Sequence, residues 1–331
     1  MIGQPRFWQK RFGLALLLLP LCLLWWIGGR VRAWRTTSYK SSLPVICIGN
    51  LTVGGTGKTP TAIMIAGCLR AAGWEPAILS RGYGGQTSGP CWVDRQTQTS
   101  ADVGDEPLLL SQHASVCVSR NRDIGARFIE TGQKHDVIIM DDGLQNPQLH
   151  KDIILGVFDG AVGIGNGWLM PAGPLRETFS KAIHRLDIVL FNGVDQTSLI
   201  TRIPETTPIF TAHLEPNSDA SDMTGQPFYA FAGIGRPKRF FDSLKSLGAD
   251  VAGAVSFADH HHYSTAELLA LASAAKALGA QLITTEKDWQ RLPIDWQERI
   301  ATLPVSLAIS DGKQDALITY LTDRLTHVLS S

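Results

Sequence analysis

The sequence predicts an α/β protein with a doubly wound, mostly parallel sheet and a second, smaller α/β domain. Short apolar runs alternate with helical patterns, as crossover connections between parallel strands require. In the first part of the chain the apolar runs cover residues 45–48, 77–80, 115–118, 137–140, 153–158, 188–191 and 209–212. At 331 residues the chain also exceeds one comfortable hydrophobic core, so we expect two domains.

Changes in composition divide the chain into three parts. We assign residues 1–40 to a hydrophobic membrane anchor with basic flanks, 41–215 to the core domain and 216–331 to the smaller domain. Residues 214–227 are rich in Pro, Ser, Asp and Gly, which is typical of a linker. Beyond it, apolar runs at 228–232, 251–256, 282–285 and 305–309 alternate with helical patterns at 236–247 and 265–278 and with a last helix.

The overall charge argues against one class of partner. Lys and Arg together number 30, as do Asp and Glu, so the formal net charge is zero and no nucleic-acid footprint is expected. The five cysteines show no C-x-x-C spacing, so neither a zinc site nor a disulfide framework is predicted. No protein partner is implied either.

The N-terminus predicts a hydrophobic membrane helix. Residues 12–27 are apolar apart from Gly13 and Pro20, and six basic residues flank them: Arg6, Lys10, Arg11, Arg30, Arg32 and Arg35. Trp25 and Trp26 occupy the place of the small residues of a cleavage site, so we expect the segment to be retained. Sixteen helical residues cover roughly 24 Å of a roughly 30 Å hydrocarbon core, which leaves both a full span and a one-leaflet anchor open. A buried core helix is a weaker alternative, because basic residues rarely flank one so densely.

The strongest functional motif follows the first predicted strand. A glycine-rich loop joins that strand to a helical pattern that begins near Lys58, as in a P-loop NTPase-like fold. Glycines let backbone N–H groups approach phosphates, Lys58 can reach the β- and γ-phosphates, and the Thr59 hydroxyl can bind Mg²⁺. The usual pattern has its first glycine where this chain has Thr52. We predict a nucleotide site made of Thr52, Val53, Gly54, Gly55, Thr56, Gly57, Lys58 and Thr59.

Other polar residues follow apolar runs and so predict further parts of a site. Asp141 and Asp142 end the run 137–140, where a P-loop protein holds Mg²⁺, although such residues can also simply form a turn. Arg81 follows the run 77–80 within S-R-G-Y-G-G and is a candidate for contacting a substrate phosphate. Asp105 and Glu106 belong to an acidic string that, taken alone, is most simply a helix cap.

Three successive histidines, His260 to His262, lie after a strand of the smaller domain. Adjacent side chains diverge and no acidic or cysteine partner stands four residues on, so zinc is not expected. The functional interpretation is that a single histidine reaches across a cleft between the domains. The alternative is a solvated histidine in a loop.

Taken together, these motifs resemble the tetraacyldisaccharide 4′-kinases, the inner-membrane lipid A 4′-kinases of Gram-negative bacteria. The similarity extends over nearly the whole chain and includes the unusual loop spacing. It rests on G-N-L-T-V-G-G-T-G-K-T-P, S-R-G-Y-G-G, G-D-E-P, D-D-G-L-Q, M-P-A-G-P-L-R-E, F-A-G-I-G-R-P, F-x-D-H and T-T-E-K-D.

The resemblance implies transfer of the γ-phosphoryl group of ATP, with Mg²⁺, to the 4′-hydroxyl of a tetraacyl disaccharide 1-phosphate. It implies that Asp105 is the base, that His260 assists it, and that Glu106 supports the metal beside Thr59, Asp141 and Asp142. His260 takes its role from the order of the motif, so His261 and His262 stay open. It also implies a lipid substrate at the bacterial inner membrane, with the active site on the cytoplasmic side.

Two other classes of protein share the coarse pattern. A membrane-attached nucleotide switch would explain Asn192-Gly193-Val194-Asp195, which is similar to the guanine-specificity motif N-K-x-D but lacks its lysine. A membrane-binding module without catalysis would leave the acidic residues at the strand ends without a chemical purpose. Both therefore explain the sequence less completely than a lipid kinase does.

Overall fold

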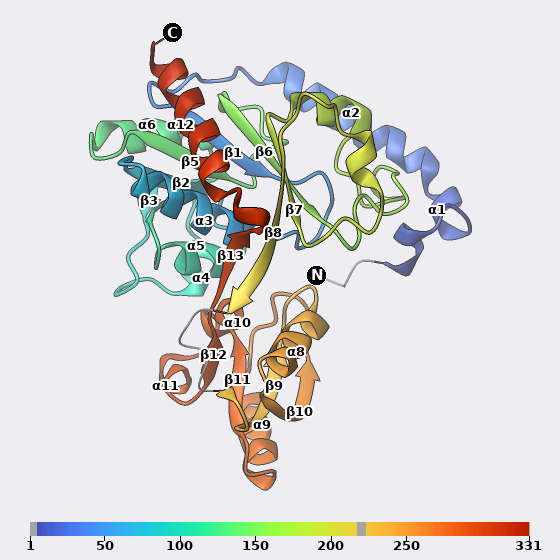
Figure 1. Ribbon diagram of the computed structural model, residues 1–331, viewed down its shortest axis with the longest axis vertical. Coiled ribbons are helices and arrows are strands. Elements are labelled where there is room, and N and C mark those ends of the chain that lie inside the picture. Colours follow the sequence, from blue (N-terminus) through green and yellow to red (C-terminus); the bar gives the residue numbers. More distant parts are fainter. Residues whose placement is uncertain (1–4, 217–222, 331) are drawn as a thin grey trace.

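The structure is a computed structural model that describes residues 5–216 and 223–330. It contains a nine-stranded sheet in the order β13-β8-β7-β6-β1-β5-β2-β4-β3 and a four-stranded sheet in the order β10-β9-β11-β12. Figure 1 shows that the smaller sheet and its helices form a separate lobe, that β8 runs from the larger lobe toward it, and that β13 runs back into the larger lobe. The predicted α/β fold with a large, mostly parallel sheet is confirmed.

The strands of the larger sheet are β1 (Val45–Gly49), β2 (Pro76–Ser80), β3 (Cys91–Trp92), β4 (Ser115–Val118), β5 (Val137–Asp141), β6 (Ile153–Asp159), β7 (Ile188–Asn192), β8 (Ile209–Pro216) and β13 (Val305–Ile309). The helices around it are α1 (Leu14–Leu17), α2 (Leu19–Arg35), α3 (Lys58–Ala71), α4 (Ser100–Val103), α5 (Asp105–Leu110), α6 (Arg122–Thr131), α7 (Phe179–Ala182) and α12 (Gln314–Ser330). Short 3₁₀ turns cover Arg6–Gln9, Ile183–Arg185, Leu199–Arg202 and Ser310–Gly312. The smaller lobe contains β9 (Pro227–Ala232), β10 (Asp250–Ser256), β11 (Gln281–Thr285), β12 (Ala301–Leu303), α8 (Pro237–Ser246), α9 (Thr265–Ala277), α10 (Glu286–Trp289) and α11 (Ile294–Gln297).

The central strand β1 shows why the sheet is doubly wound. All five of its residues are buried, because helices cover both faces of the sheet. Val45 and Cys47 belong to one hydrophobic core, and Ile46 and Ile48 belong to the core on the opposite face. Side chains alternate across a strand, so an uninterrupted apolar run is what a strand buried on both faces needs.

The C-terminal residues differ from the prediction that the smaller domain continues to residue 331. Strand β13 pairs antiparallel with β8 in the larger sheet. Helix α12 follows it and buries Leu317, Leu321 and Leu325 in the same core as Ile46 and Ile65 of the larger lobe. The predicted linker 214–227 is also shorter than expected, since 214–216 belong to β8, and its residues 217–222 lie outside the described chain.

The N-terminal apolar stretch is divided, which corrects the prediction of one membrane helix over 12–27. Helix α1 ends at Leu17 and α2 begins at Leu19. Pro20 lies in the first turn of α2, where its missing N–H is tolerated, whereas its ring would clash with the preceding turn of an uninterrupted helix. Within residues 5–216 and 223–330, no helix is both long and apolar enough to cross a membrane.

The packing of α12 predicts a large effect of one core substitution. Leu321→Ala should lower the free energy of unfolding by about 2–5 kcal/mol, because the buried side chain leaves a cavity. Urea denaturation followed by circular dichroism measures it. Leu329→Ala on the same helix is the control, since Leu329 is 55% exposed and its loss should cost less than about 0.5 kcal/mol. Equal effects of the two substitutions would show that α12 does not pack on the larger lobe as described.

Candidate active site

The site lies beyond the carboxyl ends of the parallel strands. Strand β1 is flanked by β5 and β6, and Ile48 of β1 is in register with Asp141 of β5. The loop after β1 and the acid pair after β5 therefore lie side by side at one edge of the sheet. A cavity of about 2580 Å³ opens there and extends from α2, across this edge, to the smaller lobe.

The glycine-rich loop has the backbone geometry that its sequence predicts. Gly54 and Gly57 have φ angles of +115° and +96°, which other residues rarely adopt. A Cβ on Gly57 would also lie 2.5 Å from Nδ2 of Asn192, which donates to the carbonyl of Thr56 at 3.4 Å. Helix α3 begins at Lys58, directly after Gly57, so its N-terminal N–H groups are available to an anion.

Seven of the eight predicted nucleotide-binding residues line the cavity, namely Val53, Gly54, Gly55, Thr56, Gly57, Lys58 and Thr59. Thr52 does not. It is only 4% exposed, and its backbone forms a bridge with Leu175. Thr52 therefore helps to hold the loop in place through its backbone bridge to Leu175 instead of facing the cavity.

The two aspartates after β5 have different surroundings. Oδ1 of Asp142 lies 2.9 Å from Nη1 of Arg176 and 3.6 Å from Nζ of Lys58. Asp141 is 4% exposed, and within the described chain its buried Oδ1 has no hydrogen-bond partner. Its backbone carbonyl accepts from Nη2 of Arg122 at 3.0 Å.

These surroundings shift the pKa values of the two carboxyl groups in opposite directions. Burial raises the pKa of Asp141, and the neighbouring carboxylates of Glu106 and Asp142 raise it further. Burial also raises the pKa of Asp142, but the charges of Lys58 and Arg176 outweigh it and hold that pKa below its ordinary value. The charges of Lys58 and Arg122 lower the pKa of Asp141, but burial and the two carboxylates outweigh them, so Asp141 is a buried acid whose positive neighbours compensate it only in part.

The predicted magnesium residues fit a cation bound through few protein ligands. No group of three or more His, Cys, Asp and Glu side chains in residues 5–216 and 223–330 is arranged to hold a metal ion by itself. Magnesium commonly uses one or two carboxylates, with water and phosphate oxygens completing the shell. The unpaired Oδ1 of Asp141, beside Asp142 and the cavity-lining Thr59 and Glu106, meets that requirement.

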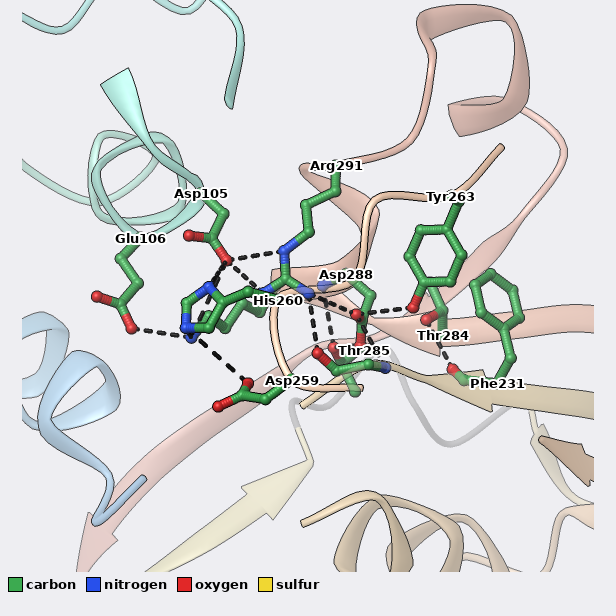
Figure 2. A network of polar contacts seen from close by, with 12 residues as sticks. Asp105, Glu106, Phe231, Asp259, His260, Tyr263, Thr284, Thr285, Asp288 and Arg291 are labelled. Atoms are coloured by element: carbon green, nitrogen blue, oxygen red, sulfur yellow. Dashed lines mark hydrogen bonds and ion pairs between the residues drawn. The ribbon is translucent and has the colours of Figure 1, made fainter. Parts of the chain in front are cut away.

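A second group of charged residues lies where the lobes meet (Figure 2). Asp105, at the first position of α5, is 5% exposed, and its Oδ2 lies 3.3 Å from Nδ1 of His260. Both Nε and Nη2 of Arg291 donate to the same oxygen. Nζ of Lys287 lies 4.0 Å from it and donates to Oε1 of Glu106 at 2.9 Å.

This arrangement keeps Asp105 ionised. Burial raises the pKa of Asp105, but its hydrogen bond with His260 and the charges of Lys287 and Arg291 lower that pKa well below its ordinary value. A carboxylate with such a low pKa holds a proton poorly but accepts a hydrogen bond well. Asp105 is therefore an ionised hydrogen-bond acceptor held in contact with His260, which lines the cavity.

The structure distinguishes the three histidines. His260 has a φ of +60° and contacts Asp105, and its ring meets the edge of Tyr83 at 5.6 Å between centroids. His261 instead pairs with Glu267 at 3.1 Å and stacks on Phe257, and the His262 side chain is exposed. Of the three histidines, the structure thus brings His260, and not His261 or His262, to Asp105.

Several site residues escaped the sequence analysis. Arg122 and Arg176 reach the acid pair, while Lys287 and Arg291 reach Asp105 and Glu106. Arg176 and Lys287 lie inside the motifs that carried the family resemblance, so the motifs could have indicated them, but no spacing rule assigned them a partner. Arg81, which was predicted, lines the cavity at the end of β2.

The guanine-like motif has a structural explanation. Asn192 donates to the carbonyl of Thr56 and so supports the glycine-rich loop. The carboxylate of Asp195 accepts hydrogen bonds from the backbone of Thr197 and Ile200 and from the Thr197 hydroxyl, so it stabilises its own turn.

The charges around Arg291 predict a strong dependence of stability on this residue. Arg291→Leu should lower the free energy of unfolding by about 3–5 kcal/mol, because it leaves Asp105 and Asp288 buried without their shared cation. Thermal and urea denaturation measure the change. Arg299→Leu, an exposed position of the same lobe, is the control and should cost less than about 1 kcal/mol. Comparable losses in both variants would contradict the role of Arg291 as a buried counter-ion.

Comparison with known proteins identifies the family. The family described as Tetraacyldisaccharide-1-P 4'-kinase matches residues 14–326. Tetraacyldisaccharide 4'-kinases of Paramagnetospirillum magneticum and Bradyrhizobium sp. are 44% and 43% identical, over 97% and 93% of this chain and 98% and 92% of theirs. The crystal structure of LpxK from Aquifex aeolicus in complex with ATP superposes with a TM-score of 0.73 at 27% identity, covering 93% of this chain and 99% of that one. The chain belongs to the tetraacyldisaccharide-1-P 4'-kinase family.

Proposed function

We propose that this protein transfers the γ-phosphoryl group of ATP to the 4′-hydroxyl of a tetraacyl disaccharide 1-phosphate, a step of lipid A biosynthesis. The observation that carries the proposal is one cavity lined by the phosphate-binding loop, the acid pair and His260 of the buried Asp105–His260 pair. A phosphate donor and an alcohol acceptor can meet there. Family membership specifies the acceptor as this lipid.

The loop and the acid pair are suited to the donor. The N–H groups of residues 54–59 and the ammonium of Lys58 would hold the β- and γ-phosphates. Thr59, Glu106, Asp141 and Asp142 would hold magnesium, which when bound neutralises charge on these phosphates. Arg176 pairs with Asp142 and so keeps that carboxylate oriented toward the loop.

Asp105 and His260 are suited to the acceptor. Asp105 would accept a hydrogen bond from the 4′-hydroxyl and hold its oxygen in line with the γ-phosphorus. Because phosphoryl transfer has a loose transition state, the hydroxyl loses its proton late, so a weak base suffices. His260 would then share the proton. It comes from the smaller lobe and Asp105 from the larger, so the pair exists only while the lobes are in contact.

The N-terminal helices would place the enzyme at its lipid substrate. Apolar side chains of α1 and α2 are widely exposed, among them Leu17 at 77%, Leu23 at 59% and Trp34 at 85%. Such a surface, with arginines beside it, is typical of a helix that lies in one leaflet of a bilayer. We place the protein at the bacterial inner membrane, with its ATP site on the cytoplasmic side.

The proposed activity predicts the behaviour of one conservative variant. Asp105→Asn should lower kcat by roughly 10²- to 10⁴-fold while KM for ATP changes little, since the amide cannot accept the proton. Transfer from labelled ATP to tetraacyl disaccharide 1-phosphate in detergent micelles measures it. Chelation of Mg²⁺ and Lys58→Ala should each abolish transfer. Asp102→Asn, three residues earlier, caps a helix and should keep kcat within about two-fold. If the wild-type protein transfers no label from ATP to the lipid, the proposed function is wrong.

The anchor predicts a loss of membrane binding without loss of folding. The double variant Leu17→Glu, Leu23→Glu should bind vesicles of anionic phospholipid roughly ten-fold more weakly or worse, because two apolar side chains no longer enter the leaflet. Co-sedimentation measures binding. Leu269→Glu is the control, since Leu269 is 58% exposed on α9 of the smaller lobe and lies outside the apolar surface. Unchanged sedimentation of the double variant would show that another surface holds the protein.

A further inference from the structure

The apolar N-terminal segment is fastened to one loop of the larger lobe, residues 166–176. The fastening uses side-chain donors of the N-terminal segment and backbone carbonyls of the loop. These are Trp8 Nε1 to Pro171 O at 3.0 Å, Arg11 Nε to Asn166 O at 2.9 Å, Cys22 Sγ to Leu169 O at 3.1 Å and Trp25 Nε1 to Arg176 O at 2.9 Å. Since backbone carbonyls accept these bonds, the position of the segment is tied to the course of the loop backbone.

The same loop is paired with the phosphate-binding loop. The N–H of Arg176 donates to the carbonyl of Leu51 at 2.8 Å, and the N–H of Val53 donates to the carbonyl of Pro174 at 2.9 Å. Thr52 and Leu175 form the antiparallel bridge between these bonds. Residues 174–176 thus form a short two-stranded ladder with the beginning of the nucleotide site.

Arg176 makes three contacts, one each with α2, the glycine-rich loop and the acid pair. Its carbonyl accepts the Trp25 indole, its N–H pairs with Leu51, and its guanidinium lies 2.9 Å from Oδ1 of Asp142. Because one residue makes all three contacts, a shift of its carbonyl also shifts its own guanidinium. The lipid-facing helix and the acid pair are therefore separated by a single residue.

We propose that Trp25 is a positioning residue for phosphoryl transfer: its indole N–H fixes the Arg176 carbonyl and thereby holds the Arg176 guanidinium against Asp142. The proposal rests on the kinase function proposed above. Trp25 contacts no reacting group and acts only through Arg176. The consequence is that the seating of α2 on the lobe sets the geometry of the catalytic edge, so a helix at the lipid surface and the ATP site are coupled.

The neighbouring tryptophan provides a matched control. Trp25 and Trp26 are similarly exposed, at 45% and 43%, and both line the cavity. Trp26 places its ring against the guanidinium of Arg30, at 5.3 Å, and so contacts its own helix. Trp→Phe keeps an aromatic ring at either position and removes the indole donor together with the same part of the ring system, so only the partner of the lost donor differs between the two variants.

The test compares Trp25→Phe and Trp26→Phe in the full chain, with tetraacyl disaccharide 1-phosphate in mixed micelles and labelled ATP. Loss of one hydrogen bond that positions Arg176 should lower kcat roughly two- to ten-fold in Trp25→Phe and less than about 1.5-fold in Trp26→Phe. KM for the lipid and co-sedimentation with vesicles should stay unchanged in both. Equal kcat in the two variants would overturn the proposal. So would a loss of kcat/KM in Trp25→Phe that comes entirely from a raised KM for the lipid.

A double-mutant cycle tests the route through Arg176. In an Arg176→Lys background, which loses the guanidinium geometry, Trp25→Phe should lower kcat by less than about 1.5-fold further. If Trp25→Phe lowers kcat in that background by the same factor as in the wild type, Trp25 acts through some residue other than Arg176. Wild-type protein that phosphorylates no lipid would overturn the proposed function itself, whereas active wild type with a silent Trp25→Phe would overturn only this inference.

Discussion

The burial of the Asp105 carboxylate is the constraint on which the site depends. At 5% exposure an uncompensated charge would cost several kcal/mol, so Asp105 requires cations beside it. Arg291 and Lys287 supply them, and both come from the smaller lobe. Arg291 is fixed in turn by Asp288, which is fully buried and also accepts from Tyr263 and the N–H of Gly233 (Figure 2). Satisfying one buried charge therefore brings the two lobes together at the point where His260 contacts Asp105.

A second contact between the lobes lies at the neighbouring strand ends. Asp159, at the end of β6, is 2% exposed and accepts from Nη1 of Arg236 at 2.5 Å and Nη1 of Arg239 at 3.1 Å. Both arginines belong to the start of α8 and line the cavity. The β8–β13 pair lies where the chain passes between the lobes (Figure 1), and these ion pairs add a side-chain contact between the lobes.

The phosphate-binding loop is held from three sides, which explains how an unusual glycine spacing keeps its geometry. Asn192 holds the carbonyl of Thr56, the 174–176 segment pairs with 51–53, and Gln145 donates to the carbonyl of Asn50. The ladder with 174–176 replaces the conformational role of a glycine at position 52, where the chain has a buried threonine. The same segment accepts the Trp25 indole of α2 at the Arg176 carbonyl, so α2 and the glycine-rich loop share one support.

Local sequence patterns predict those elements of the fold that depend only on short segments. The runs 115–118 and 305–309 are strands with the predicted bounds, and the other predicted runs match their strands within a residue or two at most ends, because buried strands need continuous apolar residues. β8 is the exception, since it continues through the polar residues 213–216 of the predicted linker. The glycine-rich loop and the acidic strand end were also readable, since backbone freedom and carboxylates at strand ends are properties of short segments.

Which distant segments meet depends on the folding of the whole chain. The two-residue strand β3 and the three-residue strand β12 are too short to produce a pattern, and they exist only because a neighbouring edge pairs with them. Val305–Ile309 was recognisable as a strand, but its pairing with β8 depends on the return of the chain to the larger sheet. Arg291 and Asp105 are 186 positions apart. Spacing carries no information over such a distance, and only the burial of opposite charges in one place shows that they belong together.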